Sequence, residues 1–432
     1  MKHILLQTLL LYLTYIPLAV LSLSSVPTWQ QLSTMPNFSH EMPFAANGAS
    51  FSSRPETSDK PTLYREHHGW CPYSERIWLA LEVLGVDYDT IYIDNIYGRP
   101  SWYSGDTPQM KWENGKIQSE SMDLVREVDK RFGNDSVCLY PKAIENQVLN
   151  KIQAFKKIFP SRARPSSRAA FLFRFDGEPL WKSEFEKVLK DTDALLSETD
   201  GPFFCGSEFT AADIAWAPFL ERYAAQLPCL HDGLDPKDDT DYPYLASWYK
   251  GMEESIPAYS CKVQGDPSSW RKVLTMAGYG NAGSVPTVIS ERMVEANARE
   301  SLPISNEEQE KQQTIWNAFV KDRPYMAASP SKEAASVLIR NKDMILPDIQ
   351  KRRSAKLVEQ NLPDDNEELD IIMRALATVL SEDMFDVDVF GQHKLRNDVI
   401  ELAAYLDQRM CVPRDMNRLS AASIKRLAAI KL

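Results

Sequence analysis

The sequence predicts an α/β domain followed by all-helical parts. Strand-like and helix-like patterns alternate between residues 62 and 132, whereas helical periodicity dominates beyond about residue 146. With 432 residues, of which 44% are hydrophobic and 25% charged, the chain is long enough for about three globular domains. We therefore expect an α/β domain over residues 60–141, a helical domain over 142–280 and a mainly helical extension over 287–432.

The first half of the α/β domain has a strand–helix–strand pattern. Residues 62–66 (TLYRE) are typical of a short strand. From Ile77 onward apolar residues recur with helical spacing, and Gly85 is placed to end that helix. Residues 88–94 (YDTIYID) are rich in β-branched and aromatic side chains, which predicts a second strand.

The second half of the domain has a strand–strand–helix pattern. Residues 108–117 (PQMKWENGKI) indicate two short strands around an Asn-Gly turn, the strongest short hairpin signal. Residues 120–132 (ESMDLVREVDKRF) then predict an amphipathic helix.

Three further segments predict the helical domain. Residues 184–198, 210–227 and 244–254 all carry helical periodicity. Thr210 followed by Asp213 is a capping-box start, in which the two side chains satisfy exposed backbone N–H groups reciprocally.

The extension also has helical patterns. The Gly-rich stretch 278–286 is a candidate boundary before it, and Ser329-Pro330 supplies an N-cap with proline at the first helical position. Apolar residues at helical spacing form two stripes: Leu369, Ile372, Leu376 and Val379, then Val399, Leu402 and Leu406. No catalytic motif occurs here, so we expect a helical module docked on the rest of the chain or on a partner. Residues 409–416 (RMCVPRDM) are distinctive, but we assign them no role from sequence.

The N-terminal residues are typical of targeting segments. Residues 1–24 begin with positive charge and continue as an apolar run, which predicts a signal peptide, with an uncleaved anchor as the alternative. Residues 25–59 are rich in Ser, Pro, Asn and Ala, and Glu41 is the only acidic residue before Arg54, which is typical of a disordered transit-like leader. The pairing predicts a plastid location, with the secretory pathway as the alternative, and a mature protein that begins near Ser53 and is not in a membrane.

Composition narrows the classes of function. The formal net charge of −11 argues against a general nucleic-acid binder. Six cysteines are sparse and include no CxxC pair, so neither a disulfide framework nor a zinc ribbon is expected. His67 and His68 lie close to Cys71, but no fourth ligand is evident, and we expect no metal.

Cys71 stands in the motif CPYS, where the first predicted helix begins. Unpaired N–H groups and the helix dipole favour negative charge at a helix N-terminus, and therefore favour a thiolate. Ser74 stands where a dithiol oxidoreductase carries its second cysteine, so turnover would need an outside thiol. Taken alone, the motif also fits a cysteine that only packs.

Other motifs, taken together with CPYS, resemble those of a known family. Thr107-Pro108 precedes the first hairpin strand, Glu120-Ser121 begins the next helix, and residues 209–223 (FTAADIAWAPFLERY) contain the capping box. In this order the motifs resemble the glutathione S-transferase superfamily over about residues 60–275. The resemblance implies an α/β thioredoxin-like N-terminal domain, an all-α glutathione-transferase C-terminal domain, and a helical extension beyond the basic two-domain family.

The resemblance also implies roles for individual residues. Cys71 would be the active-site thiol, as in the omega, lambda and dehydroascorbate-reductase types. Pro108 would be the cis-proline, and the backbone of Thr107 would pair with the cysteinyl part of glutathione. Glu120 and Ser121 would hold the γ-glutamyl end, which agrees with carboxylate–ammonium and hydroxyl–carboxylate chemistry.

Pro72 and Tyr73, which follow Cys71, complete the predicted glutathione site. The chain also departs from the family pattern, because Thr107 stands where the family usually has Val. Arg99 and Lys111 are weak candidates for the family's basic contact to glutathione.

The leading hypothesis is a glutathione-dependent thiol transferase or reductase, acting in deglutathionylation or dehydroascorbate reduction. The alternatives are conjugation of glutathione to electrophiles, and a non-enzymatic scaffold that acts through the extension. Glutathione is the expected co-substrate, with a small oxidised or electrophilic molecule or a glutathionylated protein as the second partner. We expect no nucleic acid and leave homodimerisation open.

Overall fold

The computed structural model describes residues 26–35, 44–48, 51–95, 98–159, 172–174, 176–279, 284–300, 304–384 and 393–430. The chain divides into two units. The larger unit contains Ser39–Met326 and Met410–Ala421, and the smaller unit contains Met1–Phe38, Ala327–Arg409 and Ala422–Leu432. The expected signal peptide, residues 1–24, lies outside the described residues.

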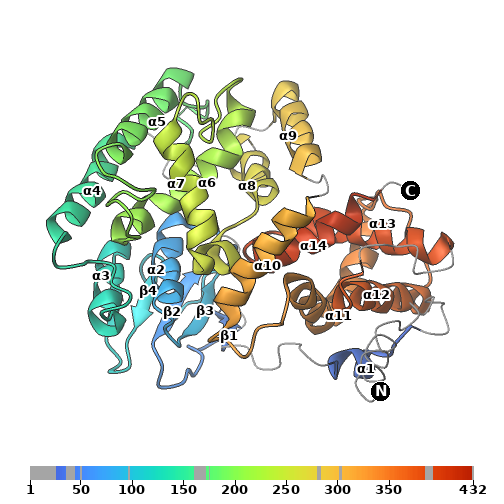
Figure 1. Ribbon diagram of the computed structural model, residues 1–432. Coiled ribbons are helices and arrows are strands. Elements are labelled where there is room, and N and C mark those ends of the chain that lie inside the picture. The colour runs from blue at the N-terminus through green and yellow to red at the C-terminus, as the bar shows by residue number, and fades with distance from the viewer. Residues whose placement is uncertain are drawn as a thin grey trace, which may run out of the picture. The chain divides into compact units, whose positions relative to one another are not determined.

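The larger unit begins with a five-stranded sheet in the order β1-β3-β2-β4-β5 (Figure 1). Its strands are β1 (Ala45–Asn47), β2 (Thr62–Glu66), β3 (Asp89–Ile93), β4 (Gln109–Lys111) and β5 (Ile117–Ser119). β3 runs parallel to β1 and β2, whereas β4 is antiparallel to β2 and β5. With helices α2 (Pro72–Val83) and α3 (Ser121–Phe132), this is the thioredoxin-like arrangement that the family resemblance implies.

Local sequence explains most of this domain. β2 lies inside the sheet and every one of its residues is buried. α2 connects the parallel strands β2 and β3, as a parallel connection requires. Gly85, with φ 61°, follows the end of α2, and Gly115, with φ 77°, allows the Asn-Gly turn between β4 and β5.

The N-terminal residues differ from the expected disordered leader over 25–59. In the larger unit β1 pairs with β3, with Ala46 opposite Ile91. In the smaller unit α1 (Trp29–Ser33) buries Leu32 completely. A leader-like composition does not prevent either element, because β1 is held by backbone pairing and α1 needs only one buried apolar residue. A mature chain that starts near Ser53 would lack both α1 and β1.

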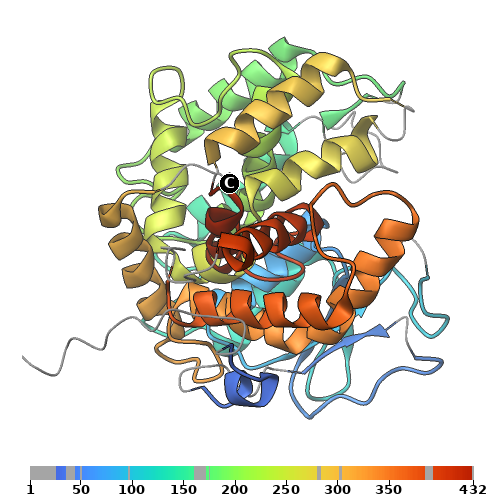
Figure 2. The ribbon, with the colours of Figure 1, turned by 90° about the vertical axis from the view of Figure 1, so that its right-hand side faces the viewer.

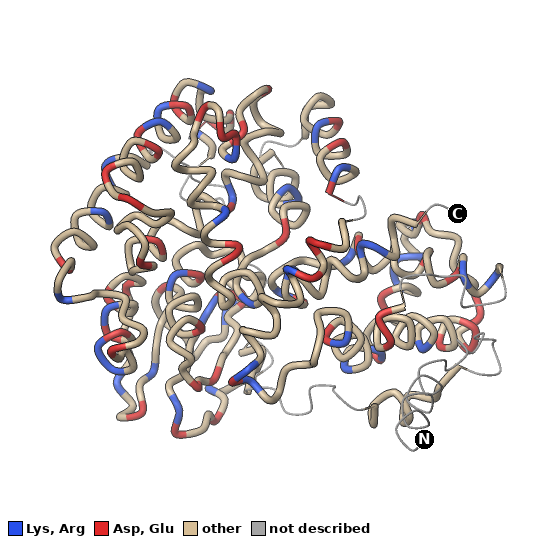
Figure 3. The backbone as a smooth tube through the Cα atoms, in the orientation of Figure 1, with Lys and Arg blue, Asp and Glu red and all other residues tan. Residues whose placement is uncertain are grey.

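The helical domain of the larger unit is built around α6, as Figure 1 shows. Its helices are α4 (Glu145–Ile158), α5 (Lys182–Leu196), α6 (Ala211–Leu230), α7 (Pro243–Ser255) and α8 (Pro267–Val273), with π-helical turns η4 (Tyr259–Val263) and η5 (Leu274–Gly278). α6 is buried over almost its whole length, because α2, α4, α8 and α9 all pack against it. Acidic and basic residues are interspersed along α4 and α5 (Figure 3), so both signs of charge line the same helices.

The predicted capping box of α6 is confirmed. Thr210 is the N-cap, its side chain accepts the N–H of Ala212, and the Asp213 carboxylate accepts the Thr210 N–H at 2.9 Å. Asp213 also accepts the N–H of Phe204 at 3.1 Å and the indole N–H of Trp248 at 3.0 Å. Burial raises the pKa of Asp213 to about 6, although its hydrogen bonds act in the other direction.

The expected boundary near residue 287 does not coincide with the division of the chain. Helices α9 (Thr287–Glu300) and α10 (Asn306–Val320) belong to the larger unit. Ile289, Trp316 and Phe319 are buried there, with α9 against α6 and α8. A Gly-rich stretch can connect packed helices as well as domains, so its composition alone does not mark a domain boundary.

The smaller unit contains α11 (Pro330–Ser354), α12 (Asn366–Ser381), α13 (His393–Arg409) and most of α14 (Arg418–Ala428). Ser329 caps α11 as predicted, and the predicted stripe of α12 is fully buried. Helices α11 and α12 lie side by side in Figures 1 and 2, with α1 packed against both. The indole N–H of Trp29 donates to Asp370 on α12 at 2.7 Å. Among the described residues, no helix has both the length and the apolar character needed to span a bilayer.

Replacing Asp213 by Ala is expected to lower the free energy of unfolding by roughly 3–5 kcal/mol, because three buried N–H donors lose their acceptor. Denaturant unfolding measures the change. Asp191→Ala on α5 is the matched control, because that carboxylate pairs with the exposed Lys187 and its loss should change little. Equal destabilisation of the two variants would contradict the capping role of Asp213.

Candidate active site

Cys71 is the N-cap residue of α2 and is half-buried. Its backbone is extended, and its side chain makes no capping hydrogen bond. Pro72 occupies the first helical position, where it needs no N–H partner. The first-turn N–H groups of a helix lack partners within the helix, so they can stabilise negative charge on the thiol.

The thiol of Cys71 contacts the loop that precedes β4. Its Sγ donates to the carbonyl oxygen of Thr107 at 3.8 Å, and the peptide bond between Thr107 and Pro108 is cis, as expected. The Thr107 hydroxyl accepts the side-chain N–H of Asn95 at 3.0 Å, and Arg99 donates to the amide oxygen of Asn95 at 2.8 Å. The hydroxyl that replaces the family's usual Val side chain therefore bonds to the neighbouring loop.

Glu120 and Ser121 lie at the N-terminus of α3. Glu120 is the N-cap residue, its side chain is exposed and makes no capping hydrogen bond, and its φ is 73°. A non-glycine residue in this left-handed region stores of order 1–3 kcal/mol of strain, and such residues cluster at functional sites. Ser121 is the first helical residue and is buried. An anion placed here would meet the free N–H groups of α3.

Two further candidates for the glutathione site, Tyr73 and Lys111, have different surroundings. Tyr73 is 49% exposed, and its ring meets the ring of Phe219 edge-on, with centroids 5.9 Å apart. Arg76 lies against both rings and donates to the carbonyl oxygen of Ala215 at 2.6 Å. Burial lowers the pKa of Arg76 to about 10. Lys111 donates to Thr57 at 3.1 Å and so already has a protein acceptor.

Glu66 is a site residue that sequence reasoning missed. It ends β2 and is buried, and its carboxylate accepts the backbone N–H of His68 and of Trp70, both at 2.9 Å. The His68 ring nitrogen lies 2.8 Å from the same carboxylate. Burial opposes ionisation, but the contacts with His68 and Trp70 outweigh it and lower the pKa of Glu66. In the sequence, Glu66 can be recognised only as an acidic residue at the end of a predicted strand.

Arg222 on α6 is the second missed residue. Its guanidinium donates to the carbonyl oxygen of Trp70 at 3.1 Å and to Glu75 at 2.7 Å. The Arg222 and Glu75 side chains are each only 2% exposed, so this ion pair is shielded from water. The residue before Cys71 is therefore held at its N–H by Glu66 and at its carbonyl by Arg222.

The other cysteines have less reactive surroundings. Burial raises the thiol pKa of the buried cysteines, to about 12 for Cys261 and about 11 for Cys411. Cys138 is half-buried like Cys71, but its pKa is also raised by burial, and its Sγ donates to the carboxylate of Asp129. In the part of the chain that the structure describes, no group of three His, Cys, Asp or Glu side chains is arranged to hold a metal.

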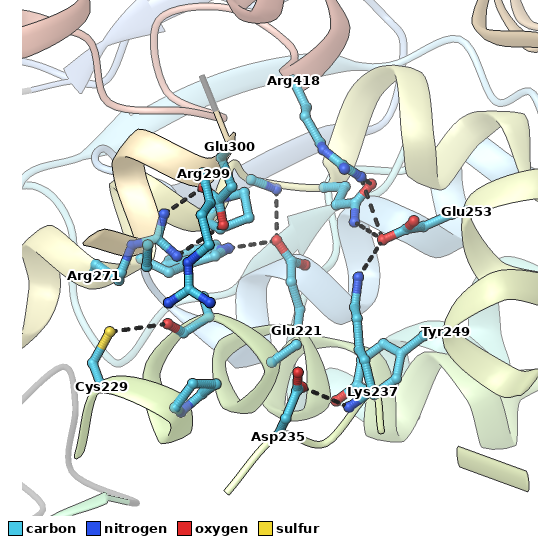
Figure 4. Close-up of a pocket in the computed structure, with 18 of the residues that line it drawn as sticks. Glu221, Cys229, Asp235, Lys237, Tyr249, Glu253, Arg271, Arg299, Glu300 and Arg418 are labelled. Atoms are coloured by element: carbon cyan, nitrogen blue, oxygen red, sulfur yellow. Dashed lines mark hydrogen bonds and ion pairs between the residues drawn. The ribbon is translucent and has the colours of Figure 1, made fainter. Parts of the chain in front are cut away.

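A cavity of about 260 Å³ lies elsewhere in the larger unit (Figure 4). Cys71 is not among its lining residues, which come mainly from α6 to α9 with Arg418. Glu253 meets Lys237 at 2.9 Å and Arg418 at 3.4 Å. Burial alone would raise the pKa of Glu253, but these two cations lower it to about 2. Because these charges already have partners, we assign the cavity no ligand.

Models of two protein families match the chain. The N-terminal domain of glutathione S-transferase matches residues 70–131, and the C-terminal domain of glutathione S-transferase matches residues 161–251.

Several curated proteins are similar. Glutathione S-transferase L2, chloroplastic, of Arabidopsis thaliana is 29% identical over 210 residues, covering 46% of this chain and 64% of that protein. Glutathione S-transferase L1 of the same plant is 27% identical over 231 residues, covering 49% of this chain and 88% of that protein. Protein IN2-1 homolog B of Oryza sativa subsp. indica is 33% identical over 170 residues, covering 37% and 64%. The chain thus spans a little under two thirds of the first and third of these relatives.

Solved structures are also similar. Glutathione transferase Omega 3C from Trametes versicolor has 19% identity and a TM-score of 0.41, covering 53% of this chain and 94% of that chain. A glutathione transferase homolog from Drosophila mojavensis, with bound glutathione, has 19% identity and a TM-score of 0.36, covering 45% and 88%.

Alkylation of the native protein at neutral pH is expected to label Cys71 before the other five cysteines, because burial raises the thiol pKa of its competitors. Peptide mapping by mass spectrometry after a short exposure to iodoacetamide measures the order. Cys138 serves as the internal control, since it is half-buried but lies beside a carboxylate. Labelling of Cys138 at the same rate as Cys71 would show that exposure alone decides reactivity.

Proposed function

Since this chain belongs to the glutathione S-transferase superfamily and carries its N-terminal and C-terminal domains, we propose that it is a glutathione-dependent thiol transferase or reductase that acts through Cys71. The observation that carries the proposal is the placement of a single thiol at the N-terminus of α2, beside Thr107 and the cis bond to Pro108. Ser74 is buried one turn into α2, so the motif holds no second thiol to resolve an oxidised Cys71.

The proposed reaction is thiol–disulfide exchange. The Cys71 thiolate attacks the glutathione sulfur of a mixed disulfide, a Cys71–glutathione disulfide forms, and the substrate thiolate leaves and takes a proton from water. A second glutathione, as its thiolate, then attacks the glutathione sulfur on Cys71. Oxidised glutathione departs and the Cys71 thiolate is restored. With dehydroascorbate as the oxidant, two glutathione thiols together supply the two electrons and two protons that it takes up.

Three groups of residues would bind glutathione in this proposal. The backbone of Thr107 would pair with its cysteinyl part, the exposed carboxylate of Glu120 would meet its ammonium group, and the Ser121 hydroxyl with the α3 N–H groups would meet its carboxylate. Pro72 and Tyr73 would line the site beside the thiol. The strained backbone of Glu120 supports this assignment, because a residue used only for capping would not need it.

Conjugation of glutathione to electrophiles is the alternative reaction. It needs a group that stabilises the glutathione thiolate without reacting with it, and a cysteine tends instead to form a disulfide with glutathione. A scaffold without enzymatic activity would not need a half-buried thiol at a helix N-terminus. We also propose a plastid location, supported by the leader-like N-terminus and by the word chloroplastic in the name of one relative.

Incubation with oxidised glutathione is expected to add one glutathionyl group to the protein, on Cys71. Intact-mass and peptide mass spectrometry test this directly. Cys71→Ser should take up none and should lose thiol transfer and dehydroascorbate reduction, because the hydroxyl cannot form the mixed disulfide. It should still bind glutathione and can reveal weak conjugating activity. Full reductase activity in Cys71→Ala would instead show that the reaction does not depend on this thiol.

Ser121→Ala is expected to raise the KM for glutathione about tenfold with little change in kcat, because it removes a hydrogen bond to a charged group that does not take part in the exchange. Steady-state kinetics with varied glutathione measures this. Ser119→Ala, at the exposed end of β5, is the matched control. A fall in kcat at unchanged KM would place Ser121 near the reacting sulfur rather than at the γ-glutamyl end.

A further inference from the structure

The distinctive sequence 409–416 lies largely in the segment Met410–Ala421, which belongs to the larger unit although it lies near the end of the chain. This segment contacts the loop that leads into Cys71. The indole N–H of Trp70 donates to the Sγ of Cys411 at 3.2 Å, and both residues are buried. Trp70 is therefore held by Glu66 at its N–H, by Arg222 at its carbonyl and by Cys411 at its side chain. Because Trp70 immediately precedes Cys71 in the chain, each of these contacts restricts the backbone that places the thiol.

A second contact involves the backbone of the same loop. Gly69 has φ 76°, which favours glycine, and a Cβ at that position would lie 3.4 Å from Cγ and 3.5 Å from Cδ of Pro413. The Pro413 ring therefore packs against the Gly69 backbone. The loop is fixed by this van der Waals contact as well as by the hydrogen bond to Cys411.

The segment is itself firmly attached to the helical domain. The N–H of Val412 donates to Ser269 on α8 at 2.9 Å, and Lys272 on α8 donates to the carbonyl oxygen of Met410 at 3.0 Å. Further along, Arg418 donates to Gln264 at 2.7 Å and meets Glu253, as Figure 4 shows. A segment anchored on both sides of Cys411 can hold Trp70 in place, which a loose tail could not do.

We infer that residues 410–418 form a positioning element for Cys71, in which Cys411 and Pro413 act through Trp70 and Gly69. The inference rests on the proposed function for its kinetic consequences. Loss of the Cys411 contact lets the thiol move away from the N-terminus of α2, which slows attack on a disulfide. Glutathione binding by Thr107 and the start of α3 should be unaffected, because among the described residues those groups make no hydrogen bond or ion pair with the segment. The element therefore changes kcat and leaves the KM for glutathione alone.

The test uses the full chain with Cys411→Ala, Cys411→Ser, Trp70→Phe and the double variant Trp70→Phe/Cys411→Ala. The substrate is the mixed disulfide of glutathione and cysteine. Cys411→Ala is expected to lower kcat about fivefold, the change in rate that corresponds to the loss of one hydrogen bond. The KM for glutathione should be unchanged. Cys411→Ser should restore most of the rate, because its hydroxyl can still accept from Trp70. The double variant should be no slower than Trp70→Phe, since both changes remove the same bond.

Cys229→Ala is the matched control, because Cys229 is also buried, lies on α6 and has no contact with Trp70 in the described residues. Equal kcat values for Cys411→Ala and Cys229→Ala, or additive losses in the double variant, would overturn the inference. The iodoacetamide alkylation rate of Cys71 at neutral pH, without glutathione, is a second readout and should fall in Cys411→Ala but not in Cys229→Ala. Should the wild type lack thiol transfer, the proposed function fails and this readout still decides the inference. If Cys411→Ala does not fold, the alkylation rate of Cys71 is compared between Cys411→Ser and Trp70→Phe. Equal rates in these two variants would overturn the inference.

Discussion

The position of Cys71 depends on the carboxylate of Glu66. A buried carboxylate is costly unless donors surround it, and here the last residue of β2 is met by the backbone N–H groups of His68 and Trp70 and by the His68 ring. Those contacts turn the chain from the sheet into the start of α2 within five residues of sequence. Removing the carboxylate would leave the loop N–H groups without an acceptor. The contacts that fix this loop therefore also place the thiol.

A second buried charge connects this loop to the helical domain. Arg222 binds Glu75 on α2 and the carbonyl of Trp70, while burial and the negative charge of Glu75 raise the pKa of the neighbouring Glu221. The carboxylate that the guanidinium meets is that of Glu75, at 2.7 Å. Breaking such a buried pair by removing one member costs about 3–5 kcal/mol. Movement of α2 against α6 would break it, so the two domains of the larger unit together determine where the thiol lies.

The sequence predicts those parts of the fold whose stabilising contacts are close in the chain. The Asn-Gly turn and the Thr210 capping box are determined by neighbouring residues, and both are confirmed. The strand at 62–66 is also confirmed, because its own residues indicate a strand, although its partners β3 and β4 lie farther along the chain. The motifs around Cys71 were found through family resemblance, which supplied the cis bond at Pro108. Contacts between distant residues could not be found in this way. Trp70 meets Arg222 after 152 positions and Cys411 after 341, and no local pattern shows which buried polar group will find which partner.

The short strand β1 covers the outer side of β3. Without it, the outer side of β3 would present unpaired N–H and C=O groups along DTIYI, a run of β-branched and aromatic residues with alternating burial. Such an edge is a template for pairing with another chain. A protein shortened to begin after β1 would keep Cys71 and every other residue assigned to the glutathione site, yet it would be prone to self-association as its concentration rises. The three residues Ala45–Asn47 thus shield β3 from such pairing, independently of the thiol chemistry.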